Sequence, residues 1–271
     1  KVYRTDGNGI FTVSNAGLPA TLSPRPTGDW GDFDNDGDPD LALATVSFTR
    51  IYRNNGTNFT DINASLPAAG DGSVAWGDFD QDGDLDLLLA GNNLLRVYRN
   101  NGNGTFSDLG LNLPGVYNAS VGWGDFDNDG WPDFAVCGST NNTVIGVVTR
   151  IYRNTLLPTA DSRQFTNFIP VAAQGPVGVW KGVVAWADYD NDGDLDLVKG
   201  NLAYRNLGGG VFSNLAVNLP YNEGFGGWDD FNRDGNLDLL LVGANACKVY
   251  RTDGNGNFTD SNAGLPAAIT V

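Results

Sequence analysis

The sequence has no methionine and no histidine, one glutamate and four lysines among its 271 residues. Because Glu, Lys and Met are good helix formers, their scarcity argues against a helical protein. The 37 glycines and 12 prolines favour turns instead. Without histidine the chain can form no imidazole base, no His-containing triad and no His-ligated zinc site. We therefore expect an all-β protein that is not an enzyme.

Positive charge is also scarce, because 16 Lys and Arg stand against 32 Asp and Glu, for a formal net charge of −16. Such a chain repels phosphates, so we expect no nucleic-acid partner. It has no apolar run of about eighteen residues, so we expect no membrane insertion. The two cysteines, Cys137 and Cys247, each end a hydrophobic run and are interpreted as buried apolar residues, not as a disulfide framework. The start at Lys1, without a signal-like segment, indicates a mature or trimmed product.

One pattern, W-x-D-[FY]-[DN]-x-D-G-x-x-D, occurs five times, and successive copies start 46, 47, 63 and 42 residues apart. Each copy leads into an apolar run of strand length, and a second recurring piece, such as VYRNNGNGTFSD at 97–108, has the composition of a β-hairpin. Four antiparallel strands in about 45 residues are the period of a propeller blade. The five copies lie in the segments 30–43, 76–89, 123–136, 186–199 and 228–241.

The predicted fold class is all-β, a single β-propeller domain over residues 1–271 with five complete four-stranded antiparallel blades and a repeated half-blade. Six or seven blades are the alternative, and a β-solenoid or an open β-sandwich array competes with a propeller. The blade number stays open because KVYRTDGNG stands at both 1–9 and 248–256. If residues 1–13 pair with residues 228–243, five blades close. If residues 265–271 begin another inner strand, the ring has six or more.

Each repeated segment contains a nine-residue loop with oxygen-bearing side chains at alternate positions and glycine at position six. Alternate side chains can turn toward one ion, and glycine permits the sharp turn. Like charges repel, and the second loop has no Lys or Arg near it in the sequence, so a cation is the expected remedy. An all-oxygen set favours Ca²⁺ over zinc or copper, and Mg²⁺ fits less well because it keeps its water. The alternative, simple Asp-Gly hairpin turns, does not account for five copies in register.

We therefore predict about five Ca²⁺ sites. Position seven is expected to ligate through its backbone carbonyl, because it is a tryptophan in the third loop. The fifth loop has Asn232 at position three and Arg233 beside it, so we predict that it binds calcium most weakly. The candidate metal-site residues are Asp32, Asp34, Asp36, Asp38 and Asp40; Asp78, Asp80, Asp82, Asp84 and Asp86; Asp125, Asp127, Asp129, Trp131 and Asp133; Asp188, Asp190, Asp192, Asp194 and Asp196; and Asp230, Asn232, Asp234, Asn236 and Asp238.

With these five segments and their YRN-x-G-x-x-F companions, the chain resembles the FG-GAP/VCBS repeat family, which is related to the calcium-loop propeller of integrin α subunits. The resemblance covers nearly the whole chain. It implies a calcium-binding propeller with an extracellular or cell-surface role in adhesion or ligand binding, and the family includes some propeller lectins. The chain departs from the family pattern at Asn232 and in its duplicated half-blade.

The predicted function is a secreted or cell-surface binding module, because propellers present loops and grooves that calcium makes rigid. A carbohydrate is the favoured ligand, since exposed aromatic rings can stack on sugars, and an extracellular protein is the other. Four aromatic residues outside the repeated core positions are the candidate ligand contacts: Trp131, Trp180, Tyr117 and Tyr221. The Tyr-Arg pair of the YRN pieces is interpreted as a structural cross-strand pair.

Two other functions remain as alternatives. One is a structural or protein-interaction segment of a larger surface protein, which a homo-oligomer without sugar affinity would favour. The other is a calcium-dependent polysaccharide-cleaving enzyme, which would use Lys181 or an arginine. The acids outside the loops, Glu223, Asp161 and Asp71, show no spacing that indicates a catalytic pair.

Overall fold

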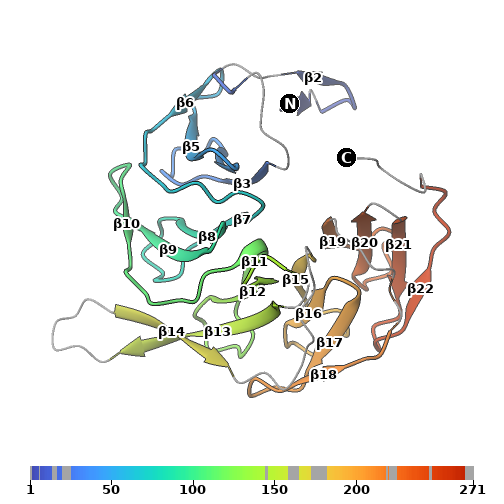
Figure 1. Cartoon of the computed structure of the whole chain (residues 1–271). Helices are drawn as coiled ribbons and strands as arrows, with labels where there is room; N and C mark the ends of the chain where they lie inside the picture. The colour runs from blue at the N-terminus through green and yellow to red at the C-terminus, as the bar shows by residue number, and fades with distance from the viewer. Residues whose placement is uncertain are drawn as a thin grey trace.

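The computed structural model describes residues 2–5, 7–13, 17–19, 26–143, 146–157, 165–171, 182–217, 219, 225–243 and 246–265. These residues form five four-stranded antiparallel sheets and one two-stranded sheet. None of them belongs to a helix that is long and apolar enough to cross a membrane. The four-stranded sheets stand around a common centre like the blades of a propeller (Figure 1). The prediction of an all-β chain built from four-stranded blades is confirmed.

The five large sheets are called blades 1 to 5 in chain order, and each runs from an inner to an outer strand. Blade 1 is β3 (Thr27–Gly31), β4 (Asp40–Ala44), β5 (Thr49–Asn54) and β6 (Phe59–Asp61). Blade 2 is β7 (Ser73–Gly77), β8 (Asp86–Gly91), β9 (Leu94–Asn100) and β10 (Phe106–Asp108). Blade 3 is β11 (Tyr117–Gly124), β12 (Asp133–Ser139), β13 (Val147–Leu157) and β14 (Phe165–Val171). Blade 4 is β15 (Val184–Ala187), β16 (Asp196–Lys199), β17 (Leu202–Asn206) and β18 (Phe212–Asn214), and blade 5 is β19 (Phe225–Asp229), β20 (Asp238–Gly243), β21 (Ala246–Thr252) and β22 (Phe258–Asp260).

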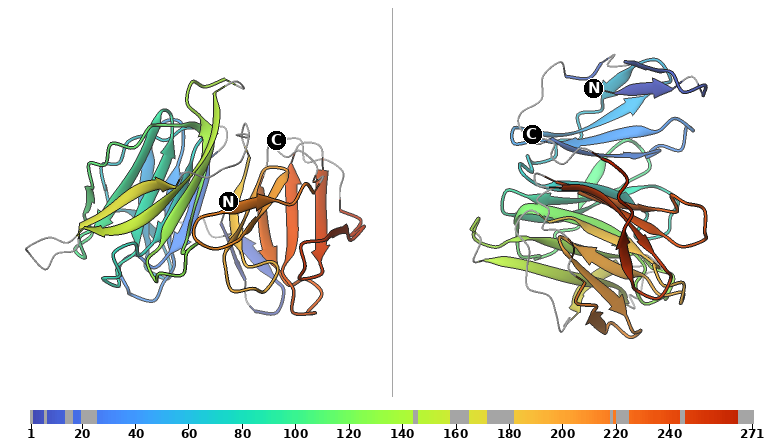
Figure 2. Two further views of the ribbon diagram at one scale, coloured as in Figure 1. Left: turned by 90° about the horizontal axis from the view of Figure 1, so that it is seen from below. Right: turned by 90° about the vertical axis from the view of Figure 1, so that its right-hand side faces the viewer.

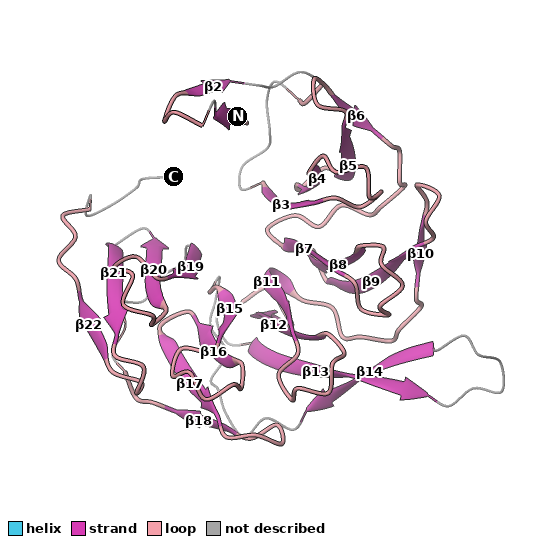
Figure 3. Ribbon diagram, turned by 180° about the vertical axis from the view of Figure 1, so that it is seen from behind, coloured by secondary structure: helices cyan, strands magenta, loops and turns pink. Residues whose placement is uncertain are grey.

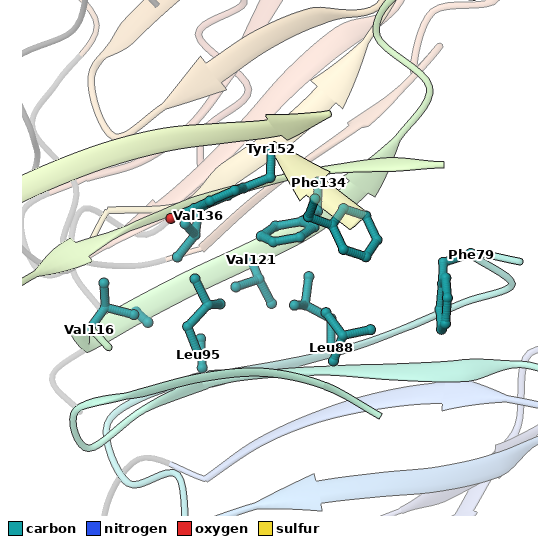
Figure 4. Close-up of a cluster of buried hydrophobic side chains, with 12 residues drawn as sticks. Phe79, Leu88, Leu95, Val116, Val121, Phe134, Val136 and Tyr152 are labelled. Carbon is teal, nitrogen blue, oxygen red and sulfur yellow. The ribbon is translucent and has the colours of Figure 1, made fainter. Parts of the chain in front are cut away.

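Apolar side chains fill the spaces between neighbouring blades. In β8, Leu87 and Leu89 pack toward blade 1, whereas Leu88 and Ala90 pack toward blade 3. All four are fully buried. Figure 4 shows Leu88 facing Val121 across the interface between blades 2 and 3. The second strand of a blade is therefore an unbroken apolar run, because both of its faces are covered.

Of the closures that the sequence left open, the pairing of residues 1–13 with residues 228–243 is not found among the described residues. β1 (Tyr3–Thr5) and β2 (Phe11–Val13) pair with each other as the separate two-stranded sheet. Residues 228–243 pair within blade 5, with the hairpin that follows them directly in the chain. That hairpin has the lower loop-closure cost because it is local. The β1–β2 hairpin lies on the open side of the ring (Figure 3).

Blade 3 differs from the others in its outer strands. The longest interval between copies of the repeat falls in this blade, and part of the additional sequence extends β13 to eleven residues and pairs it with β14. The long hairpin projects from the sheets (Figure 2). Thr155, Leu156 and Leu157 stand where other blades have an Asn-Gly turn, so nothing ends the strand at that point.

Of the two cysteines that the sequence predicted to be buried, one is buried and the other is half-buried. Cys137 is buried in the core between blades 3 and 4, and Cys247 is half-buried in β21. Both are free thiols. Each occupies an apolar position of its blade, so neither supports a disulfide framework.

Candidate metal centres

The aspartate loops connect the first and second strands of every blade, and their backbones are alike. Positions four and six have positive φ in all five, at 56° and 90° for Gln81 and Gly83 in loop two. Glycine adopts this conformation without strain, and asparagine, which holds position four in three loops, tolerates it. The backbone of loops two and five is locally strained, because position four is Gln81 in one and Arg233 in the other.

The aspartate at position one fastens the turn. In loop two, Asp78 accepts hydrogen bonds from the backbone amides of Asp82 and Gly83, both at 3.1 Å. Asp82 in turn accepts one from the amide of Asp84 at 3.1 Å. The same contacts recur in the other four loops. These carboxylates therefore hold the loop shape through their own hydrogen bonds.

The aspartate at position nine is buried behind the loop. Asp86 is fully buried and accepts hydrogen bonds from the amides of Phe79 at 3.1 Å and Asn100 at 2.8 Å. Burial raises the pKa of Asp86 to about 8, and the neighbouring acids add to the rise while these hydrogen bonds oppose it. Burial likewise raises the pKa of Asp40 to about 6 and those of Asp133 and Asp196 to about 7. A cation beside these groups would favour their charged form.

The aspartate at position three supplies the observation that fits a metal. In loops one to four its Oδ1 atom is buried and has no hydrogen-bond partner, which is costly for a carboxylate. In the same four loops, three carboxylates offer oxygens that lie within 4.8 Å of one another. A hard cation would satisfy these oxygens together. The clusters are Asp32, Asp34 and Asp36; Asp78, Asp80 and Asp86; Asp125, Asp127 and Asp133; and Asp188, Asp190 and Asp196.

Although loop two has no Lys or Arg near it in the sequence, the fold places an arginine beside it. Arg99, from the YRN piece of β9, contacts Asp80 Oδ2 through Nε and Asp82 Oδ2 through Nη2, both at 2.8 Å. The outer oxygens of the loop are thus neutralised by arginine, while the inner Oδ1 of Asp80 stays without a partner. The YRN arginines therefore support the loops as well as the strands. Their equivalents in the other loops are Arg53 with Asp34, Arg153 with Asp127 and Asp129, and Arg205 with Asp190 and Asp192.

Loop five is built differently inside the same backbone. Asn232 replaces the position-three carboxylate, and its amide donates to Asp234 Oδ2 at 2.8 Å. The Asn236 side chain donates to the other oxygen of Asp234 at 3.0 Å. No cluster of three acids occurs here among the described residues. Both Asp234 oxygens are thus occupied by neighbours within the loop.

Position seven faces the preceding loop instead of its own. The side-chain amide of Asn35 donates to Asp84 Oδ1 at 2.8 Å, and that of Asn128 donates to Asp194 Oδ1 at 2.7 Å. The side chain of Gln81 donates to the carbonyl of Gly130, beside Trp131. Hydrogen bonds of this kind link each loop to the next, and the last joins Asn191 to Asn236. The position-seven side chains of loops two, four and five are therefore hydrogen-bonded to the preceding loop.

The candidate ligand-binding aromatics are not brought together. Trp131 and Tyr117 are both half-buried, but Tyr117 begins the eight-residue strand β11, which is about 25 Å long, and Trp131 lies in the loop that follows the other end of this strand. Trp180 and Tyr221 lie outside the described residues. The sequence analysis missed two exposed aromatics, Trp30 and Phe231, each about half accessible. They belong to the first and last copies of the repeat. A terminal copy has a neighbouring copy on one side only, so the exposure of these two rings could have been predicted from the sequence.

The repeats match a known family. The profile of the FG-GAP-like repeat matches residues 32–89, 78–136 and 230–270, which together are more than half of the chain and include four of the five loops. A comparison with curated protein sequences found no match.

A comparison with solved structures matched proteins from three organisms. An Agrocybe aegerita lectin, described as recognising non-reducing terminal N-acetylglucosamine, is 19% identical with a TM-score of 0.57, over 95% of this chain and 72% of the lectin. The Photorhabdus luminescens Tc holotoxin pore is 17% identical with a TM-score of 0.46, over 92% of this chain and 12% of that one. The Vibrio cholerae biofilm matrix protein Bap1 is 12% identical with a TM-score of 0.47, over 88% and 38%. With its repeated aspartate loops and the family match, the chain belongs to the FG-GAP-like repeat family.

Proposed function

We propose that the protein is an extracellular or cell-surface binding module whose blades are stabilised by Ca²⁺, with a glycan as its ligand. The observation that supports calcium is the buried, unpartnered Oδ1 atom at position three of loops one to four. In each, a hard cation would be held by carboxylates at positions one, three and five or nine. Calcium supplies charge compensation and rigidity there, while the arginines hold the outer oxygens.

The location outside the cell follows from the same sites. Calcium sites of extracellular modules have dissociation constants of about 10⁻⁴ to 10⁻³ M, which suits millimolar calcium outside cells and not the low calcium of the cytosol. Isothermal titration of chelator-treated protein with calcium tests this step. We expect about four stronger sites and one weaker site, and no binding of Mg²⁺ at the same concentrations.

The glycan part of the proposal is supported by the fold shared with a sugar-binding lectin. A binding role also suits three of the described acids outside the loops. Asp61, Asp108 and Asp260 each pair across the strands with a base, namely Arg50, Arg96 and Lys248. They are structural partners, so they give no acid-base pair for cleaving polysaccharide. Glu223, Asp161 and Lys181 lie outside the described residues.

A glycan array, probed in millimolar calcium and again in excess chelator, tests the ligand. Calcium-dependent binding to a narrow set of sugars supports a lectin, and Trp131→Ala compared with Leu207→Ala, an exposed side chain of blade 4, then tests the aromatic contact. A blank array with folded, calcium-loaded protein contradicts the glycan proposal.

Protein contacts are the second candidate, and a specific observation favours them. Trp30, Phe231 and Phe11 are 48%, 47% and 66% exposed. They belong to β3, to the loop between β19 and β20, and to β2, and these elements border the opening in the ring (Figure 1). Exposed aromatics concentrated in one region are typical of interaction surfaces. Concentration-dependent self-association of the chain without sugar affinity would support this candidate against the glycan.

A further inference from the structure

An aromatic triad recurs at the four closed interfaces between blades. Phe33, at loop position two of blade 1, stacks on Trp76 of blade 2 with 5.9 Å between ring centroids and 9° between planes. Phe106, from the outer strand of blade 2, contacts both rings at 5.9 Å. Each interface thus takes one ring from the earlier blade and two from the later blade. The other triads are Phe79, Trp123 and Phe168; Phe126, Trp186 and Phe212; and Tyr189, Trp228 and Phe258.

Two triads are incomplete, one on each side of the opening in the ring. In blade 1, Trp30 contacts Phe59 at 5.9 Å and no loop aromatic is recorded against it among the described residues. Trp30 is consequently 48% exposed, whereas Trp76 is 9% exposed. In blade 5, the loop aromatic Phe231 is 47% exposed, whereas Phe33 is 1% exposed at the same position of loop one.

The β1–β2 hairpin already occupies the outer half of a blade between these two sides. Its sequence KVYRT aligns with TRIYRN of β5, so Val2 corresponds to Ile51. Val2 packs against the blade 1 cluster around Leu41 and Tyr52, as Ile51 packs against blade 2. Phe11 then corresponds to the outer-strand phenylalanine of a triad, and it is 66% exposed. The β1–β2 hairpin therefore packs on blade 1 as the outer half of a sixth blade would, and Phe11 remains exposed.

The open face of blade 5 has the surface that other blades cover. A hollow of about 290 Å³ lies beside Phe231, Asp238 and Val249. Leu240 and Val249 are half-buried, whereas Leu88 and Val97 at the equivalent positions of blade 2 are fully buried. The open face of blade 5 therefore carries apolar residues at the same positions that are buried in the four interfaces between blades.

Loop five, which lies beside this face, carries a positive charge at position four. Position four donates a hydrogen bond to the next loop in loops one to four, and the acceptor is Asp84 or Asp194 at position seven in two of them. In loop five this position is the exposed Arg233. An arginine here suits a following loop with an aspartate at position seven, because the two charges would pair.

We propose that the open position between blades 5 and 1 binds one more aspartate-loop hairpin, a polypeptide segment with the pattern W-x-D-[FY]-[DN]-x-D-G-x-x-D-L. Its tryptophan would stack on Phe231 and Phe11, and its loop aromatic would stack on Trp30. Its second strand would pair with β1, which in the described part of the chain pairs with β2 alone. One segment thereby completes both triads and the sixth blade.

The test extends the full chain by a copy of its own residues 72–91, joined directly after Val271. This junction leaves a connection about as long as the one between β6 and β7. The matched control carries the same extension with the copied Trp76 and Phe79 changed to alanine. We expect the intact extension to raise Tm by about 10 °C in calcium and the control to raise it by less than about 2 °C.

Oxidative footprinting then reads the exposure of single side chains. In the intact extension, we expect oxidation of Trp30, Phe231 and Phe11 to fall several-fold, while Leu207 and Val211, exposed on blade 4, stay unchanged. Equal Tm values for the two extensions, or unchanged oxidation, would overturn the proposal. Sedimentation of the unextended chain as a dimer with Trp30 and Phe231 already protected would overturn it too, because a second copy would then cover the surface.

Discussion

Loop five has the same backbone conformation as loops one to four, but it differs from them in the side chain at position three and in the hydrogen bonds around it. In loop two, Arg99 takes the outer oxygens and the buried Oδ1 of Asp80 keeps no partner. In loop five, Asn232 and Asn236 satisfy both oxygens of Asp234. Loop five thus lacks the position-three carboxylate, and two side-chain amides hold Asp234 there instead of an arginine. The positive φ values and the hydrogen bonds of position one therefore do not depend on a carboxylate at position three.

The strongest test of the contrast is removal of calcium. We expect Tm to fall by more than about 10 °C between millimolar calcium and excess chelator, because four loops lose the ion that offsets their repulsion. Hydrogen exchange should show lost protection at loops one to four and little change at residues 230–238. Calorimetry and exchange mass spectrometry check this, with magnesium as the control. Equal Tm values in calcium, magnesium and chelator would remove the distinction between the loops.

A matched pair of substitutions at position three is expected to have the next largest effect. Asp80→Ala removes a ligand and strands Arg99, so we expect it to lower the free energy of unfolding in calcium by about 3 kcal/mol. Asn232→Ala, at the same position of loop five, should cost about 0.5 kcal/mol because the residue is exposed. Urea unfolding in calcium and in chelator measures both. A similar loss for the two variants in calcium would contradict a metal role for Asp80.

The pH dependence without calcium tests the buried carboxylates. Burial raises the pKa of Asp86 to about 8 and those of Asp133 and Asp196 to about 7, above the value of about 4 in an unfolded chain. Between about pH 4 and 7 the folded chain therefore binds more protons, and the free energy of unfolding falls as pH rises. Each group contributes at most about 1.4 kcal/mol per pH unit.

Bound calcium favours the charged carboxylates, so this slope should vanish in millimolar calcium. Denaturant unfolding from about pH 5 to 8 in calcium-free buffer measures the slope. Asp86→Asn is the control variant, since it should remove the contribution of one group. A free energy that rises with pH in the absence of calcium would count against the raised pKa values.

The smallest effect on stability is expected from converting loop five into the type of the other loops. Asn232→Asp restores the position-three carboxylate, and Arg251 of the fifth YR piece is available as its partner. We expect the affinity of the weakest calcium site to increase about tenfold, with little change in Tm. Calcium titration measures the gain, and Asn255→Asp, in the exposed turn of blade 5, controls for added charge.

The sequence predicted the parts of the molecule that repeat locally. The five loops, their flanking strands and the hairpins all follow from patterns within about 45 residues. Arg99 was missed as a loop partner because it lies 17 residues after Asp82, on a different strand, and only the sheet register brings the two together. The sequence left the ring closure open because residues 1–13 and 248–260 carry nearly the same strand pair, and chain connectivity decides which of the two completes blade 5.

The hydrogen bonds between successive loops have a consequence for calcium itself. Asn35 holds the side chain of Asp84, and Asn128 holds that of Asp194, so ordering one loop fixes a residue of the next. Filling one site should then lower the entropy cost of filling its neighbour. We therefore expect calcium to bind to neighbouring loops cooperatively, so that a calcium titration gives a Hill coefficient above one.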